Sequence, residues 1–179
     1  MKGLPSWAVV VPERRAHVER VAELVERWAD AWRTPAAERE RWLRAAYLHD
    51  ALRDAPVEVL RELSQFAWTT AELLHGPAAA ELARRHGETD RGVLDAIRYH
   101  TVGSAGWDRV GKVLYLADYL EPGRPFDVAQ RAALAERVIG DFGGALRAVA
   151  GARLTWVVSS GWPLLKETVD FWNALASAG

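Results

Sequence analysis

The fold is decided by the stretch Arg41-Trp42-Leu43-Arg44-Ala45-Ala46-Tyr47-Leu48-His49-Asp50. Its apolar residues recur at the three- and four-residue spacing of one buried helical face. Asp50 comes four residues after Ala46 and continues that face, so a carboxylate enters the core beside His49. A buried carboxylate is costly unless a cation or hydrogen bonds compensate it. The pair is either an ordinary helix end with a solvated Asp or part of a metal site.

The composition is that of a globular protein with a substantial core. The chain has 179 residues, a net charge of −1 and no cysteine. The balanced charge gives no reason to expect nucleic acid or membranes as partners. The lack of cysteine excludes disulfides and thiolate metal sites. With no long apolar run and no recognisable signal peptide, we expect a single cytoplasmic domain over residues 1–179.

Helical signals follow one another along the first half of the chain. One helix is predicted from Pro12 to before Thr34, another from Pro35 to Asp50, and a third from about Val57 into Phe66. A capping box of Thr69 and Glu72 is expected to begin the next helix, Gly76-Pro77 to interrupt it, and His86-Gly87 to end the short helix that follows.

The second half is also helical in pattern. Asp90 and Asp108 are expected N-caps of the next two helices. Two or three further helices complete the chain, the last starting near Pro163, and only Leu154–Ser159 hints at a strand. Most of the nine tryptophans fall at helical spacing and are assigned to the core. The prediction is a single all-α bundle with a metal-site core over about 14–131 and C-terminal helices over 132–179.

Five of the predicted helices each direct a His, an Asp or both inward. The set is His17, His49, Asp50, His75, His100 and Asp118. Each inward His, taken alone, is more often a hydrogen-bonded core residue than a ligand. Convergence of four His and two Asp in a chain with only five His favours a metal site. His86, after Arg84-Arg85 at a helix C-terminus, is interpreted as structural and exposed.

A set of six N and O ligands suits a pair of octahedral ions, iron or manganese, with Asp50 bridging, better than a structural zinc ion. Such a pair can clamp the oxygens of a phosphoryl group. Arg14, Arg53 and Arg124 lie near the ligands in sequence and are candidate phosphate contacts, although each alone is more readily a solvated surface residue. Thr101 and Gly103 are further candidates, through a hydroxyl and a backbone N–H.

These residues, in this order, resemble the HD-domain metal phosphohydrolases. Three strings are similar to the YqeK-type branch, the symmetrical diadenosine tetraphosphate hydrolases of bacteria: Leu73-Leu74-His75-Gly76-Pro77, Ala96-Ile97-Arg98-Tyr99-His100-Thr101-Val102-Gly103 and Tyr115-Leu116-Ala117-Asp118-Tyr119-Leu120-Glu121-Pro122-Gly123-Arg124. The resemblance implies a di-iron centre on the six ligands, with manganese as the second choice of metal. It also implies cleavage of a dinucleoside tetraphosphate into two nucleoside diphosphates. Asp50, as the bridging ligand, and Arg53, as a phosphate contact, are the residues expected to be catalytic.

The chain departs from that family around the expected substrate. Arg53 stands where the family usually has lysine, and Trp107-Asp108 replaces its Met-Ser. The N-terminal Gly3–Trp7 does not resemble the usual leading helix, and 125–128 also differs. Two alternatives therefore stay open: another nucleotide phosphohydrolase on the same site, and a non-catalytic nucleotide-binding protein. A homodimer also stays open.

Overall fold

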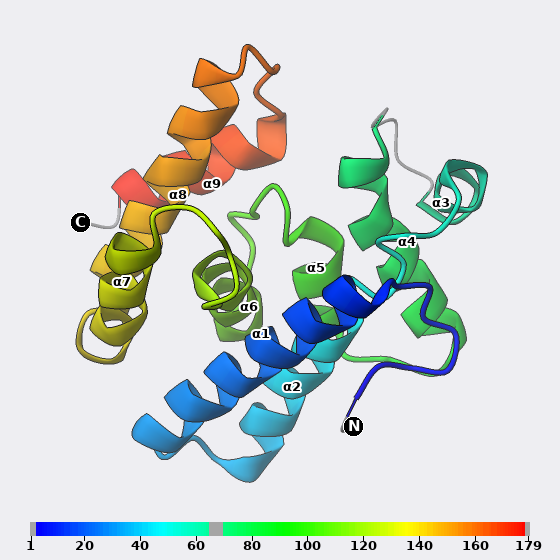
Figure 1. Ribbon diagram of the computed structural model, residues 1–179, viewed down its shortest axis with the longest axis horizontal. Helices are drawn as coiled ribbons and strands as arrows, with labels where there is room; N and C mark the ends of the chain where they lie inside the picture. Colours follow the sequence, from blue (N-terminus) through cyan, green and yellow to red (C-terminus); the bar gives the residue numbers. More distant parts are fainter. Residues whose placement is uncertain (1–2, 65–69, 178–179) are drawn as a thin grey trace.

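Every regular element in the described part of the chain is an α-helix (Figure 1). The computed structural model describes residues 3–64 and 70–177. The all-α prediction is confirmed. None of the helices in these ranges combines the length and the apolar character needed to cross a membrane.

The first two helices, α1 (Pro12–Ala31) and α2 (Ala36–Leu48), lie side by side (Figure 1). Pro12 occupies the first turn of α1, where its missing N–H costs no hydrogen bond. The segment before it is not helical, as the sequence indicated, and instead pairs with the chain after α2: Val9 donates to the Ala51 carbonyl at 2.8 Å. This pairing holds the N-terminal segment against the loop that follows His49-Asp50.

The next two helices are α3 (Val57–Ser64) and α4 (Ala71–Arg85). The predicted Phe66 and Thr69 lie outside the described residues; the N-cap of α4 is Thr70, whose side chain makes no capping hydrogen bond. The predicted interruption at Gly76-Pro77 is wrong, because α4 runs through both residues. A Cβ on Gly76 would lie only 2.8 Å from the Ile97 carbonyl oxygen, so α4 and α5 pack backbone to backbone there. This packing outweighs the hydrogen bond lost at Pro77.

The central helices are α5 (Arg91–Tyr99) and α6 (Arg109–Leu120). Both predicted caps are confirmed: Asp90 accepts from the Val93 N–H at 3.2 Å, and Asp108 from the Val110 N–H at 3.0 Å. Arg41 of α2 binds both capping carboxylates, at 2.6 Å and 2.7 Å. One arginine therefore fixes the N-termini of α5 and α6 relative to α2.

Three helices complete the chain: α7 (Val128–Gly140), α8 (Phe142–Ser159) and α9 (Lys166–Ala176). The hint of a strand at Leu154–Ser159 is wrong, since these residues form the last turns of α8. Figure 1 shows α8, in orange, extending beyond the end of α7, with α9 crossing behind it. Phe171 of α9 packs against Trp107 and Tyr115 with ring centroids 5.2 and 5.3 Å apart.

The assignment of most tryptophans to the core holds for Trp28, Trp42 and Trp107, which are buried. It is wrong for Trp156 and Trp162, which are 65% and 53% exposed. Trp156 lies near the end of α8, and Trp162 lies in the non-helical segment after it.

Candidate metal centre

The six residues predicted as ligands meet in the interior of the bundle. Each is at most 5% exposed. His17 lies in α1, His75 in the second turn of α4 and Asp118 in the last turn of α6, while His49 and His100 are the C-cap residues of α2 and α5. Asp50 directly follows α2. A helix end lets two adjacent side chains converge, as His49 and Asp50 do.

Hydrogen bonds donated by Nδ1 orient three of the four histidine rings. His49 donates to the Ala46 carbonyl and His100 to the Ile97 carbonyl, both at 2.8 Å. His17 Nδ1 lies 3.1 Å from Oε1 of Glu121. Carbonyl and carboxylate oxygens only accept, so the proton is on Nδ1 and the lone pair on Nε2 faces the centre. Metal-binding histidines are commonly fixed in this way.

The two carboxylate oxygens of Asp50 face different pairs of histidines. Oδ2 lies 3.6 Å from His17 Nε2 and 3.7 Å from His49 Nε2. Oδ1 lies 2.9 Å from His75 Nε2 and 3.5 Å from His100 Nε2. Two groups of potential ligands thus share Asp50: His17, His49 and Asp50, and Asp50, His75 and His100.

Asp118 joins the first of these groups from α6. Its Oδ1 lies 3.2 Å from His17 Nε2. Among the described residues, Nε2 of His17 and of His49 are buried without a hydrogen-bond partner. A buried polar atom without a partner is costly, and a neutral imidazole nitrogen can donate its lone pair to a metal ion instead.

The electrostatics of His49, His75 and the two aspartates favour the protonation states that bind metal. At His17, burial lowers the pKa but Asp118 and Glu121 outweigh it and raise the pKa, so a metal ion would displace a proton there. Burial lowers the pKa of His49 to about 3 and also lowers the pKa of His75, so both imidazoles are neutral. Burial alone would raise the pKa of the Asp50 carboxyl, but His49, His100 and His75 hold it well below its usual range. Likewise, His17, Arg124 and Arg153 outweigh burial and keep the pKa of Asp118 low. Metal ions require neutral His and ionised Asp.

Arginines surround the two buried aspartates. Arg14 Nη1 lies 2.8 Å from Asp50 Oδ2, and Arg124 Nη2 lies 2.6 Å from Asp118 Oδ1. Arg153 of α8 lies on the other oxygen of Asp118, at 3.4 Å. We refer to Arg14, Arg124 and Arg153 as the arginine rim, because their side chains are partly exposed while the aspartates beneath are not.

The other predicted substrate contacts are less direct. Arg53 is half-buried and acts on His75 only at longer range, where its charge adds to burial in lowering the His75 pKa. The Thr101 hydroxyl lies 3.3 Å from His100 Nε2, at the edge of the centre. The Gly103 N–H already donates to the Tyr99 carbonyl at 2.8 Å, and its Cα packs against Phe171. We therefore leave Gly103 out of the substrate contacts.

The remaining residues singled out in the sequence have structural roles. His86 is exposed at the C-cap of α4, as predicted, and stacks on Trp7 with ring centroids 5.9 Å apart. Trp107 is buried and donates its indole N–H to the Asp95 carbonyl at 3.0 Å. With Asp108 capping α6, the departure from the family pattern at Trp107-Asp108 is accounted for by contacts within the fold.

Sequence reasoning missed two residues at the centre. Glu121 is 1% exposed, accepts from His17 and is held by Arg20 Nε at 2.5 Å and by the Gly123 N–H at 2.7 Å. Its position three residues after Asp118, one turn along the same helix direction, is a signal that could have identified it. Arg153 gave no local signal, because its partner lies 35 residues away in sequence.

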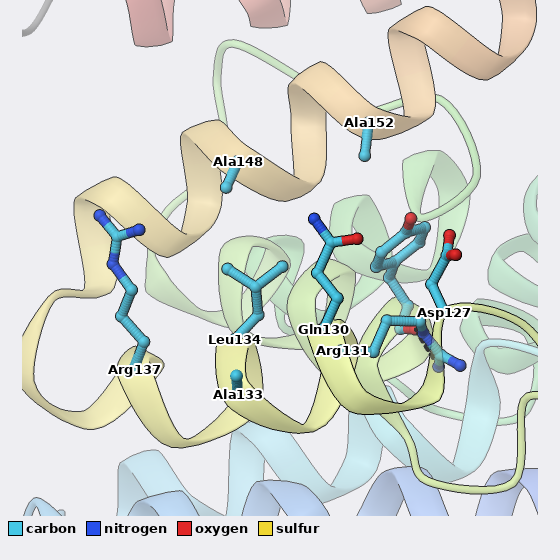
Figure 2. A pocket seen from close by; sticks show the side chains of 9 residues that line it. Asp127, Gln130, Arg131, Ala133, Leu134, Arg137, Ala148 and Ala152 are labelled. Carbon is cyan, nitrogen blue, oxygen red and sulfur yellow. Dashed lines mark hydrogen bonds between the residues drawn. The ribbon is translucent and has the colours of Figure 1, made fainter.

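A pocket of about 400 Å³ lies apart from this cluster, between α7 and α8 (Figure 2). Its lining includes Asp127, Gln130 and Arg137 together with the small side chains Ala133, Ala148 and Ala152. No predicted ligand or predicted substrate contact lines it.

Comparison with known proteins places this arrangement in a family. The model of the HD domain matches residues 14–123, the range that holds all six ligands. The chain belongs to the HD domain family. A protein of Bacillus subtilis (strain 168) named "Bis(5'-nucleosyl)-tetraphosphatase, symmetrical" is 34% identical over 142 residues, which cover 74% of this chain and 75% of that protein. A protein of the same name from Halalkalibacterium halodurans is 32% identical over 105 residues, 58% of this chain and 55% of that one.

A solved structure gives the same result for the fold. It is a predicted HD superfamily hydrolase from Clostridium acetobutylicum, described as involved in NAD metabolism. The TM-score is 0.81 at 27% identity, over 95% of this chain and 92% of that chain. The family resemblance inferred from the three sequence strings is confirmed.

Proposed function

We propose that this HD-domain protein is a metal-dependent hydrolase that cleaves diadenosine tetraphosphate symmetrically into two ADP. The observation that carries the proposal is the pair of ligand groups that share Asp50 beneath the arginine rim. The relatives named as symmetrical tetraphosphatases support the choice of substrate.

The residues fit a dinuclear centre of hard or borderline ions. His17, His49, Asp50 and Asp118 would hold one ion, and Asp50, His75 and His100 the other. The donor set of imidazole nitrogens and carboxylate oxygens, without sulfur, suits iron first and manganese second. When bound, two such ions supply Lewis acidity that makes water a nucleophile near neutral pH and neutralises charge on phosphoryl oxygens.

The side chains around the ligands prepare the site for a polyanion. Glu121 fixes the His17 ring, and the ionised Asp50 and Asp118 hold the nearest guanidinium groups in place. Arg14 and Arg124, with Arg53 and the Thr101 hydroxyl nearby, would hold phosphate oxygens. Charge that develops on the departing diphosphate would be spread over these donors, so no strong general acid is required.

The regiochemistry follows from the proposed substrate. Water adds to the second phosphorus of the four-phosphate chain, and the bond from this phosphorus to the central bridging oxygen breaks. The bridging oxygen leaves with the other half, and the two protons of water are shared between the products or lost to solvent. Both products are ADP. A homodimer and a cytoplasmic location stay predictions of the sequence.

Product identification tests the proposal. Protein reconstituted with Fe²⁺ or Mn²⁺ and incubated with diadenosine tetraphosphate should release ADP as its only nucleotide product, resolved by anion-exchange chromatography. His86→Ala is the matched control for histidine loss, because His86 is exposed and outside the centre; it should keep both metal and activity. Release of ATP and AMP would contradict the proposed site of attack. Turnover of a mononucleotide in place of the dinucleotide would favour a different HD-type phosphohydrolase.

A further inference from the structure

Arg153 reaches the metal centre from outside the range that matches the HD domain. It lies on α8, whereas the match ends at residue 123. Its Nη1 is 3.4 Å from Asp118 Oδ2, and its guanidinium carbon lies 4.6 Å from the ring centroid of Tyr115 and 5.8 Å from that of Tyr119. The C-terminal helices therefore place one arginine at a site that the rest of the chain builds.

Two tyrosine rings and one carboxylate position this guanidinium. Asp118 already has a short charge-assisted bond to Arg124 at 2.6 Å, whereas 3.4 Å to Arg153 is long for such a bond. The Tyr115 ring beneath it is buried, so the cation–π contact is well supported. Within the described chain, Asp118 is the sole hydrogen-bond acceptor for Arg153, which leaves most of its five N–H donors for another ligand.

The arginine rim is the more exposed part of these ion pairs and gives them a net positive charge. The three arginine side chains are 24%, 31% and 21% exposed, against 4% and 6% for Asp50 and Asp118. The guanidinium groups are therefore more accessible to a ligand from solvent than the aspartates are. Three arginines over two aspartates leave an excess of one positive charge, and bound metal ions would increase it. An anion of high charge is the complementary ligand.

The rim has two sides. Arg14 stands over Asp50, while Arg124 and Arg153 stand over Asp118. We propose that Arg153 is a substrate-binding residue that holds the phosphate chain on the Asp118 side, so that a polyphosphate touching both sides is favoured over a single phosphate. This inference rests on the proposed function and assigns to the C-terminal helices a part in selecting chain length.

Binding without turnover provides the test. The metal-loaded protein is titrated by calorimetry with a diadenosine tetraphosphate analogue whose central bridging oxygen is replaced by methylene, and separately with AMP. Arg153→Gln should weaken binding of the analogue about tenfold or more, with AMP affinity changed much less and metal content unchanged. Arg147→Gln makes the same charge change at an exposed position of α8 and should bind the analogue as the wild type does.

Arg153→Lys separates charge from geometry. Lysine keeps the positive charge but not the flat, stacked fork, so it should restore affinity only in part. If Arg153→Gln does not fold, Arg153→Lys decides in the same assay: a loss of threefold or more supports the proposal, and unchanged affinity overturns it.

Two outcomes would overturn the inference. One is analogue affinity in Arg153→Gln equal to that of the wild type. The other is a weakened variant that has also lost metal, since Arg153 would then be a structural link between α6 and α8. Failure of the wild type to bind the analogue would instead count against the proposed function. Inorganic pyrophosphate titrated into the same variants would then test Arg153 by itself.

Discussion

Replacing Glu121 with glutamine should weaken metal binding although all six candidate ligands are kept. Glutamine has nearly the same shape, but it removes a negative charge from a side chain that is 1% exposed. The carboxylate accepts from His17, from Arg20 at 2.5 Å and from the Gly123 N–H at 2.7 Å. An amide presents one oxygen and one NH₂ group, so at least one of these three donors must face another donor.

The size of the effect follows from these contacts. A hydrogen bond to a charged group contributes about 1.5–3 kcal/mol. Loss of a partner that orients a metal-binding histidine typically weakens metal affinity by roughly 10–100-fold. That range corresponds to about 1.4–2.7 kcal/mol, so the two estimates agree. We expect Glu121→Gln to bind metal about tenfold or more weakly.

The assay is metal occupancy across a series of chelator-buffered concentrations of free Mn²⁺, with the unfolding midpoint of the metal-free protein measured in parallel. Glu136→Gln is the control, because the Glu136 side chain is 65% exposed and its ion pair, among the described residues, is with Arg27 at the surface. Metal affinity of Glu121→Gln within twofold of the wild type would refute the positioning role. So would a loss of affinity fully explained by unfolding of the metal-free protein.

Four further variants or conditions test other parts of the structure. Asp50→Ala should lose most of the bound metal measured by elemental analysis, because both ligand groups contain Asp50; full occupancy would remove it from the centre. Arg53→Ala should keep its metal but turn over roughly tenfold more slowly, a little over 1 kcal/mol, and an unchanged rate would make Arg53 an ordinary surface charge. Gly76→Ala should destabilise the protein by about 1–3 kcal/mol in urea unfolding and reduce its metal content, because the added Cβ would lie 2.8 Å from a carbonyl oxygen of α5. Gly143→Ala is the control: a Cβ there has no neighbouring atom within 4 Å, so the stability should be unchanged or slightly higher. In the metal-free protein, burial lowers the pKa of His49 from 6.5 to about 3, so below about pH 6.5 the unfolded chain binds a proton that the folded chain does not. The free energy of unfolding should therefore fall by up to about 1.4 kcal/mol for each pH unit below about 6.5. A flat profile between pH 6.5 and 5 would contradict this.

The clustering of the six candidate ligands could be predicted from sequence because these residues lie on or beside apolar helical faces. Asp50 and Asp118 stand where the pattern requires an apolar side chain, and both are buried. The same reasoning failed at Gly76-Pro77, where local preference predicted a break and close packing on α5 kept α4 intact. Spacing also could not place Trp156, because periodicity says which face a residue shares and not whether another element covers it.

Contacts between distant segments were beyond the reach of any local pattern. Arg153 meets Asp118 only because α8 packs along α6, and its neighbours in sequence, which are small or apolar, give no sign of that contact. The exchange of Met-Ser for Trp107-Asp108 suggested an altered substrate surround, but both side chains are engaged within the fold. Composition alone does not distinguish a structural substitution from one that faces a ligand.

The candidate ligands come from five separate helices and span residues 17 to 118, so metal binding at this centre would require the folded chain. No short fragment holds more than three of the six, so a partly folded chain, freshly synthesised or unravelling, would bind metal poorly. An ion bound only by the native state stabilises it by about 2.7 kcal/mol when its free concentration is a hundred times its Kd. In a cell short of metal, the inactive metal-free protein would therefore also be unfolded and degraded more readily than the metal-bound protein. Its abundance would then follow metal availability without any dedicated regulator.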